Sequence, residues 1–294
     1  MFSGAPYFRR VALSVMTMNY GFFDHKLFIQ GFKSDLFCTE HIVYIVLVFL
    51  LPFLFAYLFR NVKHNRITAL LRVMSVLFPI LEATKITWES VYDVKYGDGF
   101  NTGGILPLYT CSLFIYTLIA AAWGKGKVRE VALSFLTTIS LLFGGIGVVY
   151  CNGLNYYPFW TFGAFYSLIF HSSMFATGVF LLITGYKKLG RRDIYLSVIP
   201  VFMLAVVAIP FDYILGCDYM LLYSGGGVPL YEDLASFLAE GGQRYLYTLI
   251  MLVTHFPLSA LVVGLYKAVS LIVAYVKKNS PNEKRPHGKI PAVN

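Results

Sequence analysis

Seven long apolar runs divide the chain into segments that can each cross a lipid bilayer. The hydrocarbon core of a membrane requires about 20 mostly apolar residues in a helix, and the runs are of about this length. They are continuous and do not alternate between apolar and polar positions, which favours helices over a β-barrel. The predicted spans are His41–Phe59, Ile67–Trp88, Ile105–Trp123, Val131–Tyr150, Thr161–Tyr186, Ile194–Leu215 and Tyr245 to about Tyr266, the last with a continuation to Tyr275 left open.

Basic residues alternate between successive loops. The loops Arg60–Arg66, Gly124–Glu130 and Lys187–Asp193, together with the tail from Lys277, carry 15 Lys and Arg, whereas the intervening loops carry only Lys95 and Arg244. Short cytoplasmic loops of membrane proteins are enriched in these residues. The pattern therefore predicts an all-α polytopic membrane protein with seven transmembrane helices, the N-terminus outside and the C-terminus cytoplasmic.

Three regions follow from these spans. Residues 1–40 form an N-terminal segment whose four basic residues run against the alternation and whose phenylalanines suit the outer membrane interface. Residues 41–276 form the seven-helix membrane domain. Residues 277–294 form a polar, basic tail predicted to be cytoplasmic and disordered.

Composition supports a multi-pass protein of the cell membrane. Hydrophobic residues make up 57% and charged residues 13% of the chain, against about 25% charged in soluble domains. This excludes a soluble enzyme and a nucleic-acid binder despite a net charge of +9, and it makes membrane lipids the expected partners. The four cysteines have no CxxC spacing, so no metal cluster or other cofactor is expected. Cys151 and Cys217 both fall on the outer side, where free thiols are favoured over a disulfide.

Ionisable groups inside the spans cluster at one depth. Such groups are costly in a membrane and usually face a cavity or a partner. With the predicted orientation, they lie between the midplane and the outer surface and come from five helices, which predicts an outward-facing polar cavity; scattered helix-packing contacts are the alternative. These residues are Glu82, Lys85, Cys111, His171, Asp212 and His255, with His41, Tyr109 and Asp218 near the outer ends. Glu82 and Lys85 are three residues apart and can pair on one helix face.

Cys111 is the one cysteine well within a predicted span, and it follows Pro107 by four residues. A cysteine and a histidine on separate helices are the minimum for acyl transfer, because the histidine takes the thiol proton and the thiolate attacks an ester carbonyl. His171 and His255 are both deep enough to serve, and Glu82 or Asp212 could orient the imidazole. No pair of these groups has HxxxH or HExxH spacing, so no metal site is predicted.

Four short strings carry a resemblance to a known family. They are Phe37–His41, Glu82 with Lys85–Trp88, Leu106–Leu113 (LPLYTCSL) and Gly216–Leu222 (GCDYMLL). In these strings the chain resembles the YwaF-type bacterial integral membrane proteins, whose animal relatives are multi-pass phospholipid acyltransferases. The resemblance implies Cys111 as nucleophile and His171 as base. Two positions depart from the family pattern, which usually has His in place of Tyr109 and Asn in place of Asp218.

Three functions remain open on this basis. The first is a lipid acyltransferase that uses Cys111 and His171. The second is a transporter that holds a small solute in the outer cavity, and the third is a non-catalytic accessory protein. A broken helix pair or an inverted repeat would favour the transporter.

The basic-residue alternation predicts membrane topology directly. We expect a reporter fused to the C-terminus to be active on the cytoplasmic side. A fusion that is active only outside the cell would contradict the orientation.

Overall fold

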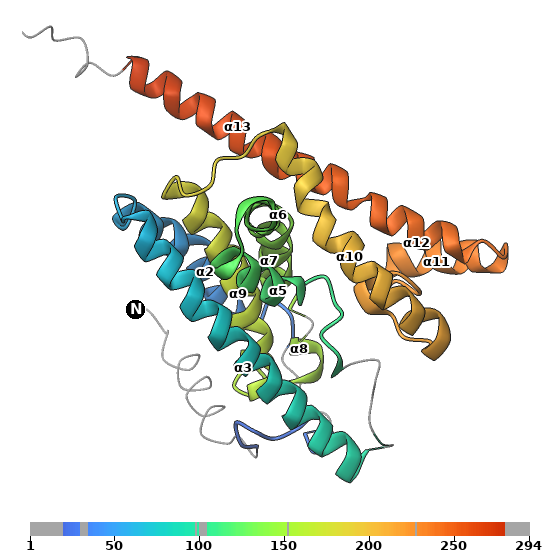
Figure 1. Ribbon diagram of the computed structural model, residues 1–294. Coiled ribbons are helices and arrows are strands. Elements are labelled where there is room, and N and C mark those ends of the chain that lie inside the picture. The colour runs from blue at the N-terminus through green and yellow to red at the C-terminus, as the bar shows by residue number, and fades with distance from the viewer. Residues whose placement is uncertain are drawn as a thin grey trace, which may run out of the picture.

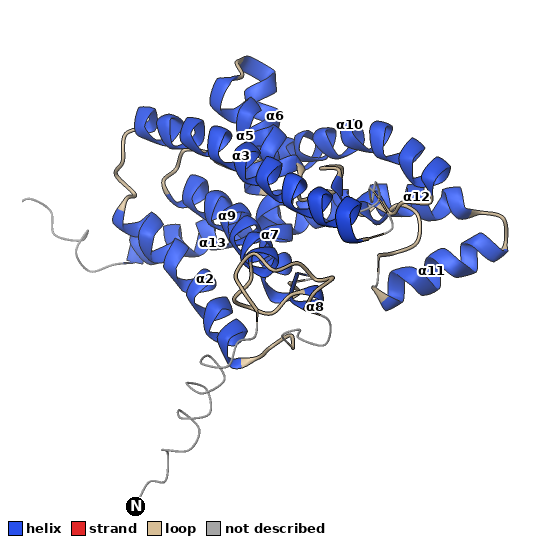
Figure 2. Cartoon of the chain, turned by 90° about the horizontal axis from the view of Figure 1, so that it is seen from below, coloured by secondary structure: helices blue, strands red, loops and turns tan. Residues whose placement is uncertain are grey.

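The computed structural model describes residues 20–29, 35–97, 99, 105–151, 153–226 and 228–279. These residues form helices and loops without strands (Figure 2). The longer helices are α2 (Thr39–Leu58), α3 (His64–Tyr96), α5 (Leu113–Trp123), α6 (Gly126–Thr137), α7 (Ile139–Val149), α9 (Phe162–Ile183), α10 (Arg191–Leu215), α11 (Pro229–Glu240), α12 (Arg244–Val253) and α13 (His255–Asn279). Two short turns are α8 (Gly153–Tyr156) and the 3₁₀ helix η1 (Tyr219–Leu221).

Helices α6, α7 and α9 form the centre of the bundle (Figure 1). Helices α2 and α3 lie on one side of this centre, and α10 and α13 lie on the other. The continuous stretch through α6 and α7 is the most buried of the candidate spans, whereas α2 leaves apolar side chains such as Leu50 and Leu54 exposed. Exposed apolar faces of this kind are suited to contact with lipid tails.

Glycines let α7 and α9 approach closely. A Cβ added to Gly144 would lie 2.5 Å from the backbone nitrogen of Phe175 and 2.8 Å from the carbonyl oxygen of His171. Gly178 of α9 is equally crowded, against the side chain of Leu141. Small residues at helix crossings are typical of membrane bundles. The stretch Gly144–Gly147 of α7 therefore packs closely against α9.

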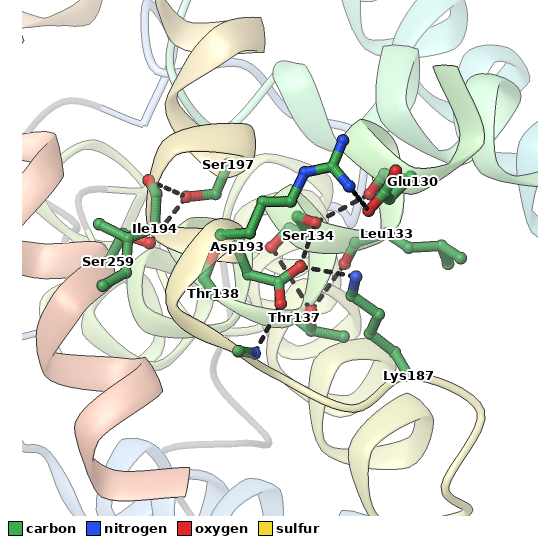
Figure 3. Close-up of polar contacts among 12 residues, drawn as sticks. Glu130, Leu133, Ser134, Thr137, Thr138, Lys187, Asp193, Ile194, Ser197 and Ser259 are labelled. Atoms are coloured by element: carbon green, nitrogen blue, oxygen red, sulfur yellow. Dashed lines mark hydrogen bonds and ion pairs between the residues drawn. The ribbon is translucent and has the colours of Figure 1, made fainter. Parts of the chain in front are cut away.

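A buried carboxylate joins three elements at the end of the bundle where α10 begins (Figure 3). Asp193 accepts hydrogen bonds from Ser134 of α6 at 2.6 Å and from the backbone N–H of Gly190 at 2.7 Å, and it pairs with Lys187 at 2.6 Å. Deeper in the same region Ser197 of α10 and Ser259 of α13 are hydrogen-bonded at 2.7 Å. These polar contacts join α6 to α10 and α10 to α13. They are directional, so they fix the positions of the three helices along their axes more firmly than apolar contacts do.

The three basic loops gather at this same end. Arg129, which belongs to the second of them, donates a hydrogen bond to Thr68 of α3 at 3.1 Å and another to the hydroxyl of Tyr186. A polar cavity of about 420 Å³ lies between them, lined among others by His64, Arg129 and Lys187. The structure thus places the predicted cytoplasmic loops on one side, and the sidedness itself stays a prediction.

The third predicted span differs from the structure. Within the described part of the chain, six helices are long and apolar enough to cross a membrane, and α5, with 11 residues, is not among them, since it rises only about 16 Å. The segment before it, 105–112, is irregular because Pro107 has no N–H and disfavours helix before it. A count of seven full transmembrane helices is therefore not confirmed.

Two other spans are broken and one is longer than predicted. The span Val131–Tyr150 is divided at Thr138, which has φ −125° and ψ −89°, and the last span is divided at Thr254 into α12 and α13. Helix α3 continues two turns beyond Trp88 to Tyr96. At about 1.5 Å per residue it exceeds the thickness of the hydrocarbon core, so one end projects beyond it.

The close approach of α7 and α9 gives a stability test. We expect Gly144→Ala to destabilise the protein by about 1–3 kcal/mol, because the new methyl group meets backbone atoms that cannot yield. Gly264→Ala on α13 is the matched control, since an added Cβ there meets nothing within 4 Å. Thermal unfolding in detergent checks this; equal melting temperatures for the two variants would contradict it.

Candidate functional site

Cys111 lies in the irregular segment that leads into α5. Tight turns satisfy the backbone of this segment: the N–H groups of Ser112, Leu113 and Phe114 donate to carbonyls three residues earlier at 2.9–3.3 Å. The hydroxyl of Tyr116 donates to the carbonyl of Pro107 at 3.0 Å. Non-helical backbone at membrane depth needs such partners. The result is a half-buried thiol on an ordered turn at the head of a short helix.

Glu82, Lys85 and Tyr166 form a polar cluster beside this thiol. Glu82 is 6% exposed and accepts a hydrogen bond from the Tyr166 hydroxyl of α9, and the ammonium of Lys85 lies 5.9 Å from the Tyr166 ring centroid. Both charges lie within electrostatic range of Cys111. Cys111 and Tyr166 also pack against the same apolar cluster, so the thiol and the two predicted charged residues of α3 lie in one region of the bundle.

Tyr109 connects the Cys111 segment to the loop after α10. Its ring packs edge-on against the fully buried Tyr219, with centroids 5.0 Å apart. Burial raises the pKa of Tyr219 to about 12, so its hydroxyl stays protonated at neutral pH. Tyr109, a position at which the resemblance implies a histidine, thus packs against another tyrosine.

The two predicted aspartates on this side support the loop. Asp212, fully buried at the end of α10, accepts the N–H of Tyr219 at 2.7 Å. Asp218 accepts the N–H groups of Tyr223 at 2.8 Å and Ser224 at 3.0 Å, and the hydroxyl of Ser224 at 2.9 Å. These bonds hold Met220 at φ 56° in the left-handed region, which non-glycine residues rarely adopt. Asp218 therefore stabilises the conformation of the loop that follows α10.

His171 faces α7. Its Nδ1 donates to the carbonyl of Ser167 at 2.8 Å, which leaves Nε2 of the neutral ring as an acceptor. The ring lies so close to Gly147 that a Cβ there would come within 2.1 Å of it. Tyr166 and Phe170, by contrast, pack with the apolar cluster that Cys111 joins. No contact between Cys111 and His171 is present among the described residues.

The other two predicted histidines lie in different places. His41 is fully buried at the start of α2; its Nε2 donates to the carbonyl of Val148 at 2.8 Å and its Nδ1 accepts the N–H of Phe37 at 3.1 Å. Both nitrogens are thus used: Nε2 joins α2 to α7, and Nδ1 holds the residues that precede α2. His255 opens α13, donates through Nδ1 to Met251 at 3.0 Å and stacks on Phe143. None of the four cysteines, all of them in the described part of the chain, forms a disulfide.

An apolar groove of about 500 Å³ runs along α5. Leu113 and Tyr116 line it near the Cys111 turn, and Lys127 and Val128 line it near the basic loops. Helix α10 forms the opposite wall with Ile199, Met203 and Val207. Its walls and length suit an acyl chain that lies along the helix.

Sequence reasoning missed Tyr166. The chain has 22 tyrosines, and nothing in its local sequence marks this one as the partner of a carboxylate on another helix. The packing of α9 against α3 supplies that information.

A model of the TMEM164 family matches residues 36–266. This covers most of the chain, so the chain belongs to the TMEM164 family, a family of multi-pass membrane proteins. No curated protein and no solved structure matches it.

The shared contact to Tyr166 predicts coupling between Glu82 and Lys85. Glu82→Gln removes the negative charge that Lys85 faces across the Tyr166 ring, and breaking a buried charge pair costs about 3–5 kcal/mol. The double variant with Lys85→Met removes both charges and should be less destabilised. Thermal unfolding in detergent measures the difference; a double variant that is additive or worse would contradict the coupling.

Proposed function

We propose that this TMEM164-family membrane protein transfers acyl chains between lipids, with Cys111 as the nucleophile. The observation that carries the proposal is the position of the Cys111 turn. This turn leads into Leu113 and Tyr116, which line the apolar groove along α5, and its thiol is under the electrostatic influence of Glu82 and Lys85. A thiol, an ionisable partner and a site for an acyl chain are the parts that such a reaction requires.

The cluster offers a route for the thiol proton. The proton of the Cys111 Sγ–H passes to the carboxylate of Glu82, and the ammonium of Lys85 then faces the thiolate and stabilises it. The thiolate attacks the ester carbonyl of a lipid held in the groove, and the C–O bond breaks as the lysolipid leaves with the proton from Glu82. The hydroxyl of a second lysolipid then attacks the thioester and restores the thiol.

The base predicted from sequence was His171. Its protonation state suits a base, because Nδ1 is committed to Ser167 and Nε2 can accept a proton. Glu82 acts electrostatically on Cys111 and the His171 ring packs on Gly147, so both residues are candidates for the base, which requires hydrogen-bond reach or one bridging water. Comparing Glu82→Gln with His171→Gln assigns the role: the variant of the acceptor should lose about 10²–10⁴-fold in rate.

Cys111→Ala should abolish transfer, because no thioester can form. The assay reconstitutes the full chain in phospholipid vesicles with a labelled acyl donor and a lysophospholipid acceptor, and in parallel labels the thiol with a lipid-like electrophile. Cys151→Ala is the matched control: Cys151 is a second buried free thiol, hydrogen-bonded to Ser167. Transfer that survives Cys111→Ala, or equal labelling of both variants, would contradict the proposal and favour a binding or transport role.

A further inference from the structure

A second charged cluster lies where α3 projects beyond the predicted end of its span. Glu89 and Asp93 are one helical turn apart on α3, and the N-terminal segment folds back so that His25 meets them. The segment is held by Trp88, which donates to the carbonyl of Phe23 at 2.9 Å, and by Phe162, whose N–H donates to Phe22 at 2.6 Å. The cluster thus joins residues some 65 positions apart.

All three side chains are removed from solvent. His25 is fully buried, Glu89 is 8% exposed and Asp93 is 7% exposed. One ligand-capable atom from each, a ring nitrogen or a carboxylate oxygen, lies within 4.8 Å of the others. The ring of His25 stacks on Tyr92 at 4.9 Å and meets Trp88 edge-on at 5.1 Å. These aromatic walls lower the local dielectric and strengthen every charge interaction inside.

The charges in the cluster do not balance. Glu89 accepts hydrogen bonds from His25 at 2.8 Å and from Tyr157 at 3.0 Å, and it pairs with Lys26 at 2.9 Å. Asp93 differs from Glu89, because its buried Oδ2 has no hydrogen-bond partner among the described residues. Lys26 therefore neutralises one of two carboxylates. A buried, unpaired carboxylate is costly and calls for a cation.

We propose that His25, Glu89 and Asp93 bind a divalent transition-metal ion of the zinc class. One imidazole and two carboxylates form a ligand set used by Zn²⁺, with a fourth position left open. Two carboxylates match the charge of the ion once Lys26, whose side chain is 35% exposed, turns outward. Ligands at about 2.1 Å lie up to about 4 Å apart, so the cluster contracts by about 1 Å.

Binding has two consequences for the chain. When the ring nitrogen that now contacts Glu89 coordinates the ion, the proton of the neutral ring moves to the other ring nitrogen. Binding weakens in acid because protons compete with the ion for the imidazole and the two carboxylates. The ion also ties the N-terminal segment to α3 in place of the Lys26 ion pair. The site involves no residue of the proposed acyl-transfer reaction, so the two proposals stand or fall separately.

Metal content of the purified protein tests the site. The full chain, with an affinity tag that contains no histidine, is stripped with a chelator, dialysed against Zn²⁺ in detergent and analysed for bound metal. We expect about one ion per chain and a higher melting temperature with Zn²⁺, with little response to Mg²⁺. Asp93→Asn, which keeps the side-chain shape, should lose both. Asp212→Asn, the matched control at another buried carboxylate with an unpartnered oxygen, should keep both.

Lys26→Met separates a metal site from a simple ion pair. If the ammonium competes with the ion for Glu89, this variant should bind Zn²⁺ about tenfold more tightly than the native protein. Absence of stoichiometric zinc from the native chain overturns the proposal, and so does zinc that Asp93→Asn retains. Zinc bound by Lys26→Met alone also overturns it, because the ammonium would then be the native occupant.

Discussion

The whole structure depends on one constraint: inside a bilayer each backbone N–H and C=O must find its partner within the protein. The long apolar runs meet it by forming helices. The segment around Cys111 meets it differently, with three-residue turns and the Tyr116 hydroxyl on the Pro107 carbonyl. Such irregular backbone is tolerated only where the protein encloses it. The neighbours that enclose it also place a thiol beside Glu82, Lys85 and Tyr166.

The same constraint governs the charged side chains. Asp193 is buried, and it accepts hydrogen bonds from Ser134 and Gly190 and pairs with Lys187, so its role is structural. Asp218 accepts hydrogen bonds from the backbone of the loop that it stabilises. Glu82 is hydrogen-bonded to Tyr166 and acts electrostatically on the Cys111 thiol, whereas Asp93, like Asp212, has a buried oxygen without a hydrogen-bond partner among the described residues. The two proposals begin from the carboxylates of Glu82 and Asp93.

The two proposed sites lie at different heights along α3. Glu82 and Lys85 face the α9 side chain Tyr166, whereas Glu89 and Asp93 lie one to two turns further along, under the N-terminal segment. Aromatic residues, Trp88 and Tyr92 among them, pack around the cluster of His25, Glu89 and Asp93. A single long helix thus presents charged residues to both sites, and the second site lies on the part of the helix that extends beyond its predicted span.

The sequence by itself determined the helical membrane class, the position of most spans and the grouping of the basic loops, because apolar run length and Lys/Arg distribution are local properties of a chain in a bilayer. It also singled out Glu82, Lys85 and Cys111. Only the tertiary structure decided that the third span begins its helix at Leu113, that His171 packs on Gly147, and that Tyr166 and His25 meet distant carboxylates. The physical reason is that side-chain contacts between helices depend on rotation and crossing geometry, which composition and periodicity leave undetermined.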